Sequence, residues 1–271
     1  MEMIRRVLTI AGSDSSGGAG IQADLKTMLA NGVYGMSAIT ALTAQNTQGV
    51  RMVQEATPEF LAAELDAVFE DIRPNAVKVG MVASPALIRV IAEKLQGYGA
   101  EHVVVDPVMV ATSGAKLLED EAVEVLVQEL FPLAEVITPN IPELSALTGA
   151  EVVDEAAFQR AAEQLAAQAH VNVLAKGGHS AGEASDLLVM ADGKGEKWYR
   201  GTRVENPNTH GTGCTLSSAI AANLAKGFDL AESIGRAKSY LFGALLAKMD
   251  LGTGSGPVDH SWNLHGDFFE N

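Results

Sequence analysis

The chain is poor in cysteine and in positive charge, and it lacks long hydrophobic runs. Its single cysteine excludes an internal disulfide framework and fits a reducing compartment. The N-terminal apolar run ends at Asp14, too early for a signal peptide or a membrane span. The 19 Lys and Arg against 34 Asp and Glu give a net charge of −15, which argues against nucleic acid or membrane partners. We expect a soluble, cytoplasmic protein.

Several well-known cofactor motifs are also missing. The chain contains no G-x-x-x-x-G-K-[ST] loop, and the glycines of residues 12–20 do not fit the dinucleotide pattern G-x-G-x-x-G. The six histidines show no metal-ligand spacing, and one cysteine cannot build a cysteine-rich zinc site. These absences disfavour a nicotinamide-dependent oxidoreductase and a zinc enzyme.

Apolar runs bounded by Gly, Pro or Asn alternate with longer amphipathic segments from end to end. The runs lack strict alternation, as expected of strands that are covered on both faces. They occupy residues 7–11, 36–42, 76–79, 102–105, 136–138, 171–175 and 186–190. No linker or repeat divides the chain, so the sequence predicts one α/β domain over residues 1–271 with a doubly covered sheet.

Side chains that cap helix N-termini mark several helix starts. The predicted caps are Thr57, Ser84, Asp154 and Asp229. Proline follows each of the first two, which suits the first helical position.

The most informative segment is 208–215, which leads into an apolar helix-like stretch. Because Gly211, Thr212 and Gly213 stand at the helix start, several N–H groups can point at one anion, and the helix dipole adds to this preference. Cys214 lies in the same turn. A small packed side chain is the ordinary alternative for a lone cysteine, but this position favours a proton acceptor beside a phosphate.

Two further loops follow predicted strands. The small residues of 12–20 allow a ligand to approach the backbone, although a flexible turn is the alternative. Gln45 follows the second strand, and its amide can offer a donor and an acceptor to a heteroaromatic ring. A polar loop without a ligand explains Gln45 equally well.

Charged side chains follow three other predicted strands. Asp106 and Glu143 could hold Mg²⁺ directly or through water, and Lys176 suits a triphosphate contact. The alternatives are helix capping by Asn140, turn chemistry for the acids and an ordinary surface lysine.

Together these residues resemble the hydroxymethylpyrimidine/phosphomethylpyrimidine kinases of thiamine biosynthesis, a branch of the ribokinase-like superfamily. The resemblance runs nearly end to end. The matching segments are 8–14, 17–27, 43–47, 78–81, 138–140, 176–179, 208–215 and 256–260.

The resemblance implies a three-layer αβα sandwich with a mostly parallel central sheet, and a homodimer. It implies ATP-dependent phosphorylation, with Mg²⁺, of 4-amino-5-hydroxymethyl-2-methylpyrimidine and then of its monophosphate to the diphosphate. Small-molecule pyrimidine and ATP are the implied partners.

The resemblance also implies roles for individual residues. Gln45 should bind the pyrimidine edge, with Asp24 as a weaker polar contact. Packing against the ring is implied for Gly12, Ala19, Met81 and Val108. Magnesium is implied for Asp106 and Glu143, and ATP contact for Lys176, Asn140 and Thr209. The anion hole would consist of Gly211, Thr212, Gly213 and Cys214. Cys214 would act as the base, with the pKa of its thiol lowered toward neutral by the helix N-terminus.

Pro207 departs from the family pattern, where lysine is frequent, and it removes a charge and an N–H near the nucleotide. The main alternative function is a pyridoxal or pyridoxine kinase of the same branch, or dual activity. Gln45 favours the pyrimidine, because its amide pairs well with a ring nitrogen and an exocyclic amine. A non-catalytic ligand-binding protein is the remaining alternative.

Overall fold

The computed structural model describes residues 4–109, 119–178, 184–193 and 195–266, which include a nine-stranded sheet of order β3-β2-β1-β4-β5-β6-β7-β8-β9. The strands are β1 (Arg6–Asp14), β2 (Tyr34–Asn46), β3 (Gly49–Glu55), β4 (Ala76–Val79), β5 (Val103–Val105), β6 (Val136–Ile137), β7 (Asn172–Lys176), β8 (Asp186–Val189) and β9 (Glu196–Tyr199). The six central strands from β2 to β7 pair in parallel, and β3, β8 and β9 join antiparallel.

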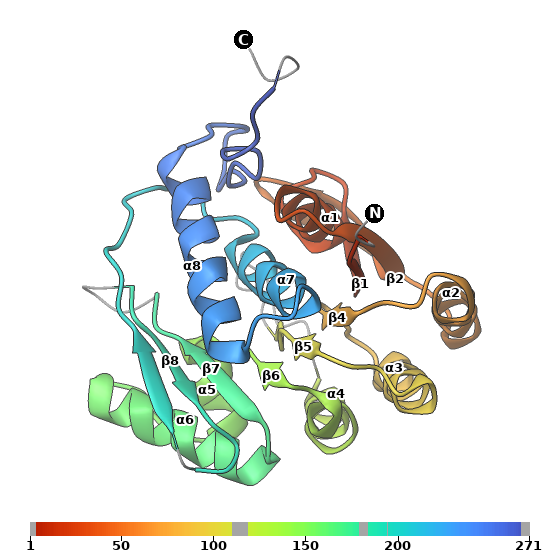
Figure 1. Cartoon of the computed structure of the whole chain (residues 1–271), viewed down its shortest axis with the longest axis horizontal. Helices are drawn as coiled ribbons and strands as arrows, with labels where there is room; N and C mark the ends of the chain where they lie inside the picture. The colour runs from red at the N-terminus through yellow and green to blue at the C-terminus, as the bar shows by residue number, and fades with distance from the viewer. Residues whose placement is uncertain (1–3, 110–118, 179–183, 194, 267–271) are drawn as a thin grey trace.

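Helices cover both faces of this sheet (Figure 1). On one face lie α1 (Gly20–Ala30), α7 (Thr212–Ala225) and α8 (Leu230–Leu246). On the other lie α2 (Pro58–Asp71), α3 (Pro85–Tyr98), α4 (Asp120–Val125), α5 (Ile141–Thr148) and α6 (Glu155–Ala169). A π-helical turn (Leu126–Leu130) and a 3₁₀ turn (Phe131–Leu133) extend α4. This is the three-layer α/β arrangement that the sequence predicts.

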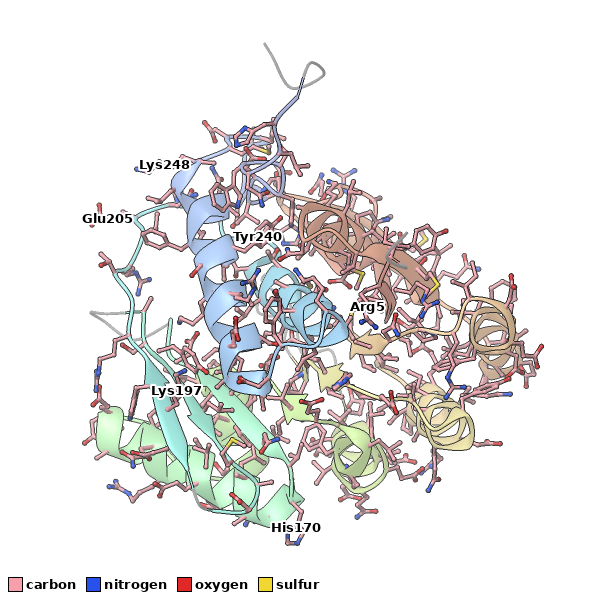
Figure 2. All side chains as sticks on the ribbon, in the orientation of Figure 1. Arg5, His170, Lys197, Glu205, Tyr240 and Lys248 are labelled. Carbon is pink, nitrogen blue, oxygen red and sulfur yellow. The ribbon has the colours of Figure 1, made fainter. Side chains whose placement is uncertain are left out.

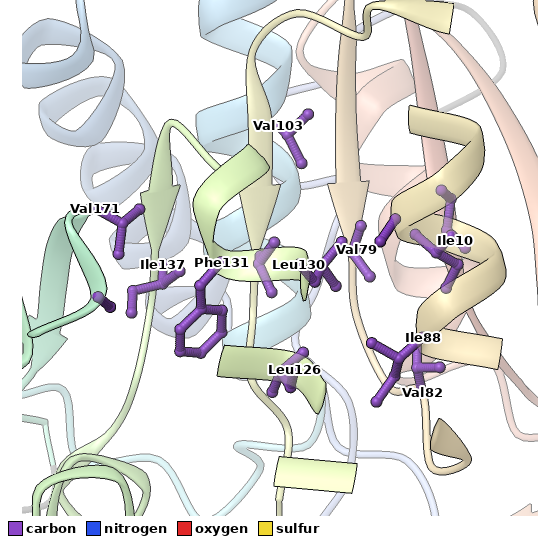
Figure 3. Close-up of a cluster of buried hydrophobic side chains, with 14 of the residues drawn as sticks. Ile10, Val79, Val82, Ile88, Val103, Leu126, Leu130, Phe131, Ile137 and Val171 are labelled. Atoms are coloured by element: carbon purple, nitrogen blue, oxygen red, sulfur yellow. The ribbon is translucent and has the colours of Figure 1, made fainter. Parts of the chain in front are cut away.

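Two hydrophobic cores result from this layering, one on each side of the sheet. Val103 and Val105 of β5 point into one core, and Val104 between them points into the other. Figure 3 shows part of the first core, where Ile137 lies beside Phe131. The central strands are apolar without alternation because both of their faces are buried.

The sequence misses two strands at the ends of the sheet. Every residue of β3 is exposed or half-buried, and β9 begins with two exposed charged residues, so neither forms an apolar run. The sequence also does not predict that β8 runs antiparallel, because a buried strand has the same pattern in either direction. The seven predicted strands are all present. The strand 76–79 has its predicted bounds, and the ends of the other six differ from the prediction by at most four residues.

The predicted helix caps are confirmed. The side chains of Thr57, Ser84, Asp154 and Asp229 each accept a hydrogen bond from a backbone N–H in the first turn of α2, α3, α6 and α8. Within the described residues, no helix has both the length and the apolar character needed to cross a lipid bilayer.

Candidate active site

A cavity of about 780 Å³ lies at the carboxyl ends of the parallel strands. This edge is where ligands bind in open α/β sheets. The cavity is lined by nearly all of the predicted site residues: Gly12, Ala19, Gln45, Met81, Asp106, Val108, Asn140, Glu143, Lys176, Thr209, Gly211, Thr212, Gly213 and Cys214. Glu205, labelled in Figure 2, also lines it from the connection between β9 and α7.

The first turn of α7 forms one wall of the cavity. Gly211 caps this helix with φ of 83°, and a Cβ at this position would collide with the carbonyl oxygen of Gly18. Glycine is therefore required here both for its conformation and for the close approach. Among the described residues, no acceptor is paired with the N–H groups of Gly213 and Cys214. The turn can thus donate two hydrogen bonds to an anion.

Asp106 and Lys176 form an ion pair at the floor of the cavity. Lys176 Nζ lies 2.7 Å from Asp106 Oδ1, and the hydroxyl of Thr138 donates to the same oxygen at 2.9 Å. Burial opposes ionisation of both groups, but their attraction keeps the pKa of Asp106 below and the pKa of Lys176 above their ordinary values. Both groups are charged, and both line the cavity.

Glu143 caps helix α5 and also lines the cavity. Its carboxylate accepts the backbone N–H of Asn140 at 2.8 Å, and the Asn140 side chain accepts the N–H of Glu143 at 2.9 Å, which completes a capping box at α5. Helix capping by Asn140 is therefore confirmed, although both residues also line the cavity. Burial and the charge of Asp106 raise the pKa of Glu143 to about 6, against the attraction of Lys176.

The carboxylates of Asp106 and Glu143 fit a magnesium ion held partly by phosphates. Asp106 Oδ1 is occupied by Lys176 and Thr138, whereas the one hydrogen bond to Oδ2 from the part of the chain that the structure describes is a 3.5 Å contact with the Ser217 hydroxyl. Burial is the main reason why the pKa of Glu143 is raised, so a cation beside this carboxylate would favour its ionised form. The described residues contain no group of three or more potential metal ligands. Mg²⁺ commonly binds one or two carboxylates plus phosphates and water, so these two acids suffice.

Asp24 is the one predicted site residue that does not line the cavity. It is fully buried, and its two oxygens lie 3.0 and 2.9 Å from Lys78 Nζ, a lysine that is also fully buried. Thr9 and Ser218 donate to the same carboxylate at 2.6 and 2.7 Å. The prediction of a direct polar contact with substrate is therefore wrong, because three groups of the protein occupy this carboxylate.

The thiol of Cys214 is not activated in the way that the sequence predicts. Burial raises its pKa to about 11, and the nearby carboxylates of Asp24 and Asp106 add to this increase. Lys78 and the N–H of Gly20 act in the opposite direction without balancing it. The expected lowering by the helix N-terminus is outweighed, so the thiol is protonated at neutral pH.

Sequence reasoning assigns no role to Lys78 or to the contact between Asp14 and His210. Lys78 lies in the predicted strand 76–79, and a lysine inside an apolar run signals a buried ion pair. His210 belongs to the glycine-rich segment before α7, and its Nε2 lies 2.8 Å from Asp14 Oδ2. Asp14 and His210 are 196 positions apart, so no local pattern in the sequence indicates that they are in contact.

We predict that Glu143→Gln stabilises the ligand-free protein above pH 6. The folded-state pKa of about 6 exceeds the ordinary value of 4.5, so ionised Glu143 destabilises the folded protein at high pH. Below pH 4.5 the side chain is protonated in both the folded and the unfolded state, and this destabilisation disappears. Glutamine keeps an acceptor for the Asn140 N–H. The free energy of unfolding at pH 8 should rise by about 2 kcal/mol, and the gain should vanish near pH 4.

Chemical denaturation between pH 4 and pH 8 measures this difference. Glu93→Gln, on the exposed face of α3, is the matched control and should change stability little at either pH. A Glu143→Gln variant that is less stable than the wild type at pH 8 would contradict the argument.

Comparison with known proteins places this geometry in a family. Residues 14–259 match the phosphomethylpyrimidine kinase family. The chain is 52% identical over 257 residues to the hydroxymethylpyrimidine/phosphomethylpyrimidine kinase of Rhizobium meliloti, covering 93% of this chain and 96% of that protein. It is also 52% identical to the thiamine biosynthesis bifunctional protein ThiED of Geobacter sulfurreducens, covering 94% of this chain but only 52% of that longer protein.

Solved structures of two kinds of kinase are similar to the structure of this chain. The phosphomethylpyrimidine kinase of Clostridium difficile shares 48% identity and a TM-score of 0.78, covering 88% of this chain and 98% of that one. The ADP complex of Bacillus subtilis pyridoxal kinase shares 36% identity and a TM-score of 0.87, covering 96% and 98% of the two chains. The family match spans most of the sequence and the relatives align over nearly their full length, so the chain belongs to the phosphomethylpyrimidine kinase family of ribokinase-like kinases.

Proposed function

We propose that this protein phosphorylates 4-amino-5-hydroxymethyl-2-methylpyrimidine with ATP, and then phosphorylates the monophosphate to the diphosphate, in thiamine biosynthesis. One observation carries the proposal. A single cavity has Gln45, Met81 and Val108 among its lining residues, together with Lys176, Asp106 and the first turn of α7. It therefore offers an amide and apolar contacts for a ring and charged groups for phosphates. The family match supports the same reaction.

In the reaction, the hydroxymethyl oxygen attacks the γ-phosphorus of ATP. The bond between this phosphorus and the oxygen bridging to the β-phosphate breaks, and ADP leaves. The N–H groups of Gly213 and Cys214 and the ammonium of Lys176 are placed to stabilise the transferred phosphoryl group. Most of the acceleration comes from positioning and charge neutralisation, because phosphoryl transfer needs little covalent work from the protein.

Asp106 and Glu143 would hold Mg²⁺ beside the phosphates, for which Asn140 and Thr209 supply further polar lining. When bound there, the ion supplies charge neutralisation for the phosphates and offsets the negative charge of Asp106. Pro207 stands where lysine is frequent in the family. Pro207 does not line the cavity, although its neighbour Asn206 does, so this position contributes no positively charged side chain to it.

Cys214 is the proposed acceptor of the hydroxyl proton in the first phosphorylation. Its side chain lines the cavity at the helix terminus that receives the phosphoryl group. Because the pKa of the thiol is about 11, only a small fraction is thiolate at neutral pH. The second phosphorylation has a different requirement. Its nucleophile is a phosphate oxygen that already carries negative charge at pH 7, so no base is needed.

Pyridoxal kinase activity is the second candidate function. The structural similarity to Bacillus subtilis pyridoxal kinase, over 96% of this chain, favours it. The higher identity to phosphomethylpyrimidine kinases and the presence of Gln45 at the cavity favour the pyrimidine as the main substrate.

We predict that an ATP-to-ADP assay with Mg²⁺ shows turnover of both the hydroxymethylpyrimidine and its monophosphate, with little turnover of pyridoxal. The three substrates are offered separately, and ATP without substrate is the control. A preference for pyridoxal would retain the phosphate chemistry and overturn the substrate assignment. No turnover with any of the three would favour a non-catalytic binding protein.

We predict that Cys214→Ala lowers kcat for the hydroxymethylpyrimidine by about 10²-fold, the usual contribution of a general base, with little change in KM for the pyrimidine. The monophosphate reaction should lose less than about tenfold, because its nucleophile is already ionised. In the wild type, kcat for the first step should rise about tenfold per pH unit from pH 7 to 9, since the thiolate of a group with pKa about 11 increases in this way.

Steady-state kinetics on the two substrates measure this difference within one variant. Cys214→Asp should flatten the pH profile, because aspartate is ionised throughout the range. Equal losses on both substrates, or a flat wild-type profile, would remove Cys214 from the role of base.

We also propose that the protein is a homodimer, which its exposed sheet edge supports. Leu42 of β2 and Met52 and Val53 of β3 are 52%, 70% and 50% exposed. Met52 and Val53 lie on the edge strand β3 and Leu42 on the strand beside it, and exposed apolar side chains at a sheet edge favour association. Light scattering at micromolar concentration should give twice the mass of one chain, and the mass of a single chain would contradict the dimer.

We infer that residues 1–271 form one domain, which the continuous nine-stranded sheet supports. We infer a cytoplasmic location from the single cysteine and the acidic composition.

A further inference from the structure

A buried carboxylate organises the turn between β1 and α1. Asp14 is 3% exposed, and its Oδ1 accepts the backbone N–H and the hydroxyl of Ser16, both at 2.8 Å. Its Oδ2 accepts the backbone N–H groups of Gly18 at 3.1 Å and Ala19 at 2.9 Å. Although burial acts against ionisation, hydrogen bonds from His210, Ser16 and Ala19 hold the pKa of Asp14 well below its usual range. Asp14 is therefore an acceptor only.

His210 brings the turn before α7 onto this carboxylate. Its Nε2 lies 2.8 Å from Asp14 Oδ2, and the ring is packed against Gly18, where a Cβ would collide with it. His210 is 5% exposed, and its backbone N–H donates to the carbonyl of Gly256 at 3.1 Å. Because a carboxylate cannot donate, the proton in the Asp14 contact must be on His210 Nε2.

The same histidine nitrogen touches the amide of Gln45. The structure places Gln45 Nε2 3.3 Å from His210 Nε2, and Gln45 Oε1 3.1 Å from the hydroxyl oxygen of Thr43. Nitrogen and oxygen of an amide exchange places by a half-turn, and the hydrogen-bond network decides between the two orientations. A protonated Nε2 cannot accept a hydrogen bond from the amide nitrogen, so the atom facing it must be the amide oxygen, which shares the one Nε2 proton with Asp14 Oδ2 at the longer distance.

Thr43 leads to the same orientation independently. Its hydroxyl lies 2.8 Å from the carbonyl oxygen of Ser13, which can only accept. The one proton of this hydroxyl is therefore used, and toward Gln45 the hydroxyl acts as an acceptor. Its partner must then be the amide nitrogen.

We propose that Asp14 and His210 are positioning residues that lock the Gln45 amide with its oxygen toward His210 and its nitrogen toward Thr43, and so set which ring edge the site accepts. The proposal deepens the proposed function, because it concerns substrate recognition at the same cavity. Asp14 and His210 do not themselves react in this proposal, and they act on the substrate only through Gln45.

Each amide atom keeps one site free in this orientation. The nitrogen uses one N–H on Thr43 and has a second. The oxygen shares the His210 proton with Asp14 and keeps a second lone pair. The amide can thus offer a donor and an acceptor at fixed places to a ring with a complementary pair. The 14–20 turn is held at the same time against the turn that contains Gly211 and the phosphate-binding N–H groups. The ring and the phosphate acceptor are therefore positioned relative to each other.

Substitution of His210 tests the proposal. His210→Leu removes the donor while filling similar space, and it leaves Asp14 buried without this partner. We expect KM for the hydroxymethylpyrimidine to rise at least tenfold, with less than threefold change in KM for ATP. His210→Gln restores an N–H donor and should recover part of the loss. His102→Asn is the control, since it breaks a surface contact of the same type, His102 to Glu135 at 2.6 Å, and should change neither constant.

A spectroscopic measurement on the ligand-free wild type separates this proposal from the kinase assignment. Two-bond ¹H–¹⁵N spectra of the histidine rings report which nitrogens carry protons, and loss of one signal in His210→Gln assigns that signal to His210. We expect a proton on Nε2 between pH 6 and pH 8. A ring protonated only on Nδ1 overturns the proposal, whether or not the protein turns over a pyrimidine. So does an equal rise of both KM values in His210→Leu, or a His210→Gln variant no better than His210→Leu. Absence of kinase activity with the expected spectrum would refute the substrate and leave the positioning pair intact.

Discussion

The buried ion pair between Lys78 and Asp24 holds together the elements beneath the cavity. Lys78 belongs to the central strand β4 and Asp24 to α1, and Ser218 of α7 donates to the same carboxylate. Cys214 lies one helical turn before Ser218, so this pair fixes where the N-terminus of α7 meets the sheet. Removing one partner would leave an uncompensated charge, which is far more costly than the pair itself. The position of the glycine-rich turn at the start of α7 depends on this contact.

The cavity contains positively charged groups, although the net charge of the whole molecule is negative. A chain with net charge −15 repels a triphosphate at long range. Lys176 and the free N–H groups at the start of α7 provide positive potential within the cavity, where surrounding salt screens it less than at the surface. Asp106 compensates the charge of Lys176 in the ligand-free protein. The local arrangement therefore outweighs the overall charge at contact distance.

Much of the fold and site is readable from sequence, because apolar strands followed by polar turns place Gln45, Asp106 and Lys176 at one sheet edge. The two failures at Asp24 and Cys214 have a common cause. Asp24 is occupied by Lys78, 54 positions away, and the pKa of Cys214 depends on carboxylates from two distant segments. No local pattern encodes such contacts. Strand β3 is missed for a different reason, since its side chains are largely exposed and carry no apolar period.

The protonated state of Cys214 has a consequence for chemical durability. Only the thiolate reacts readily with peroxide or alkylating reagents. With a pKa of about 11 and a half-buried side chain, the lone sulfur of the ligand-free protein is a poor target for oxidation. The same desolvation and carboxylates that oppose its ionisation protect it from damage. A cysteine can therefore persist at this position without a second cysteine nearby to rescue it from oxidation.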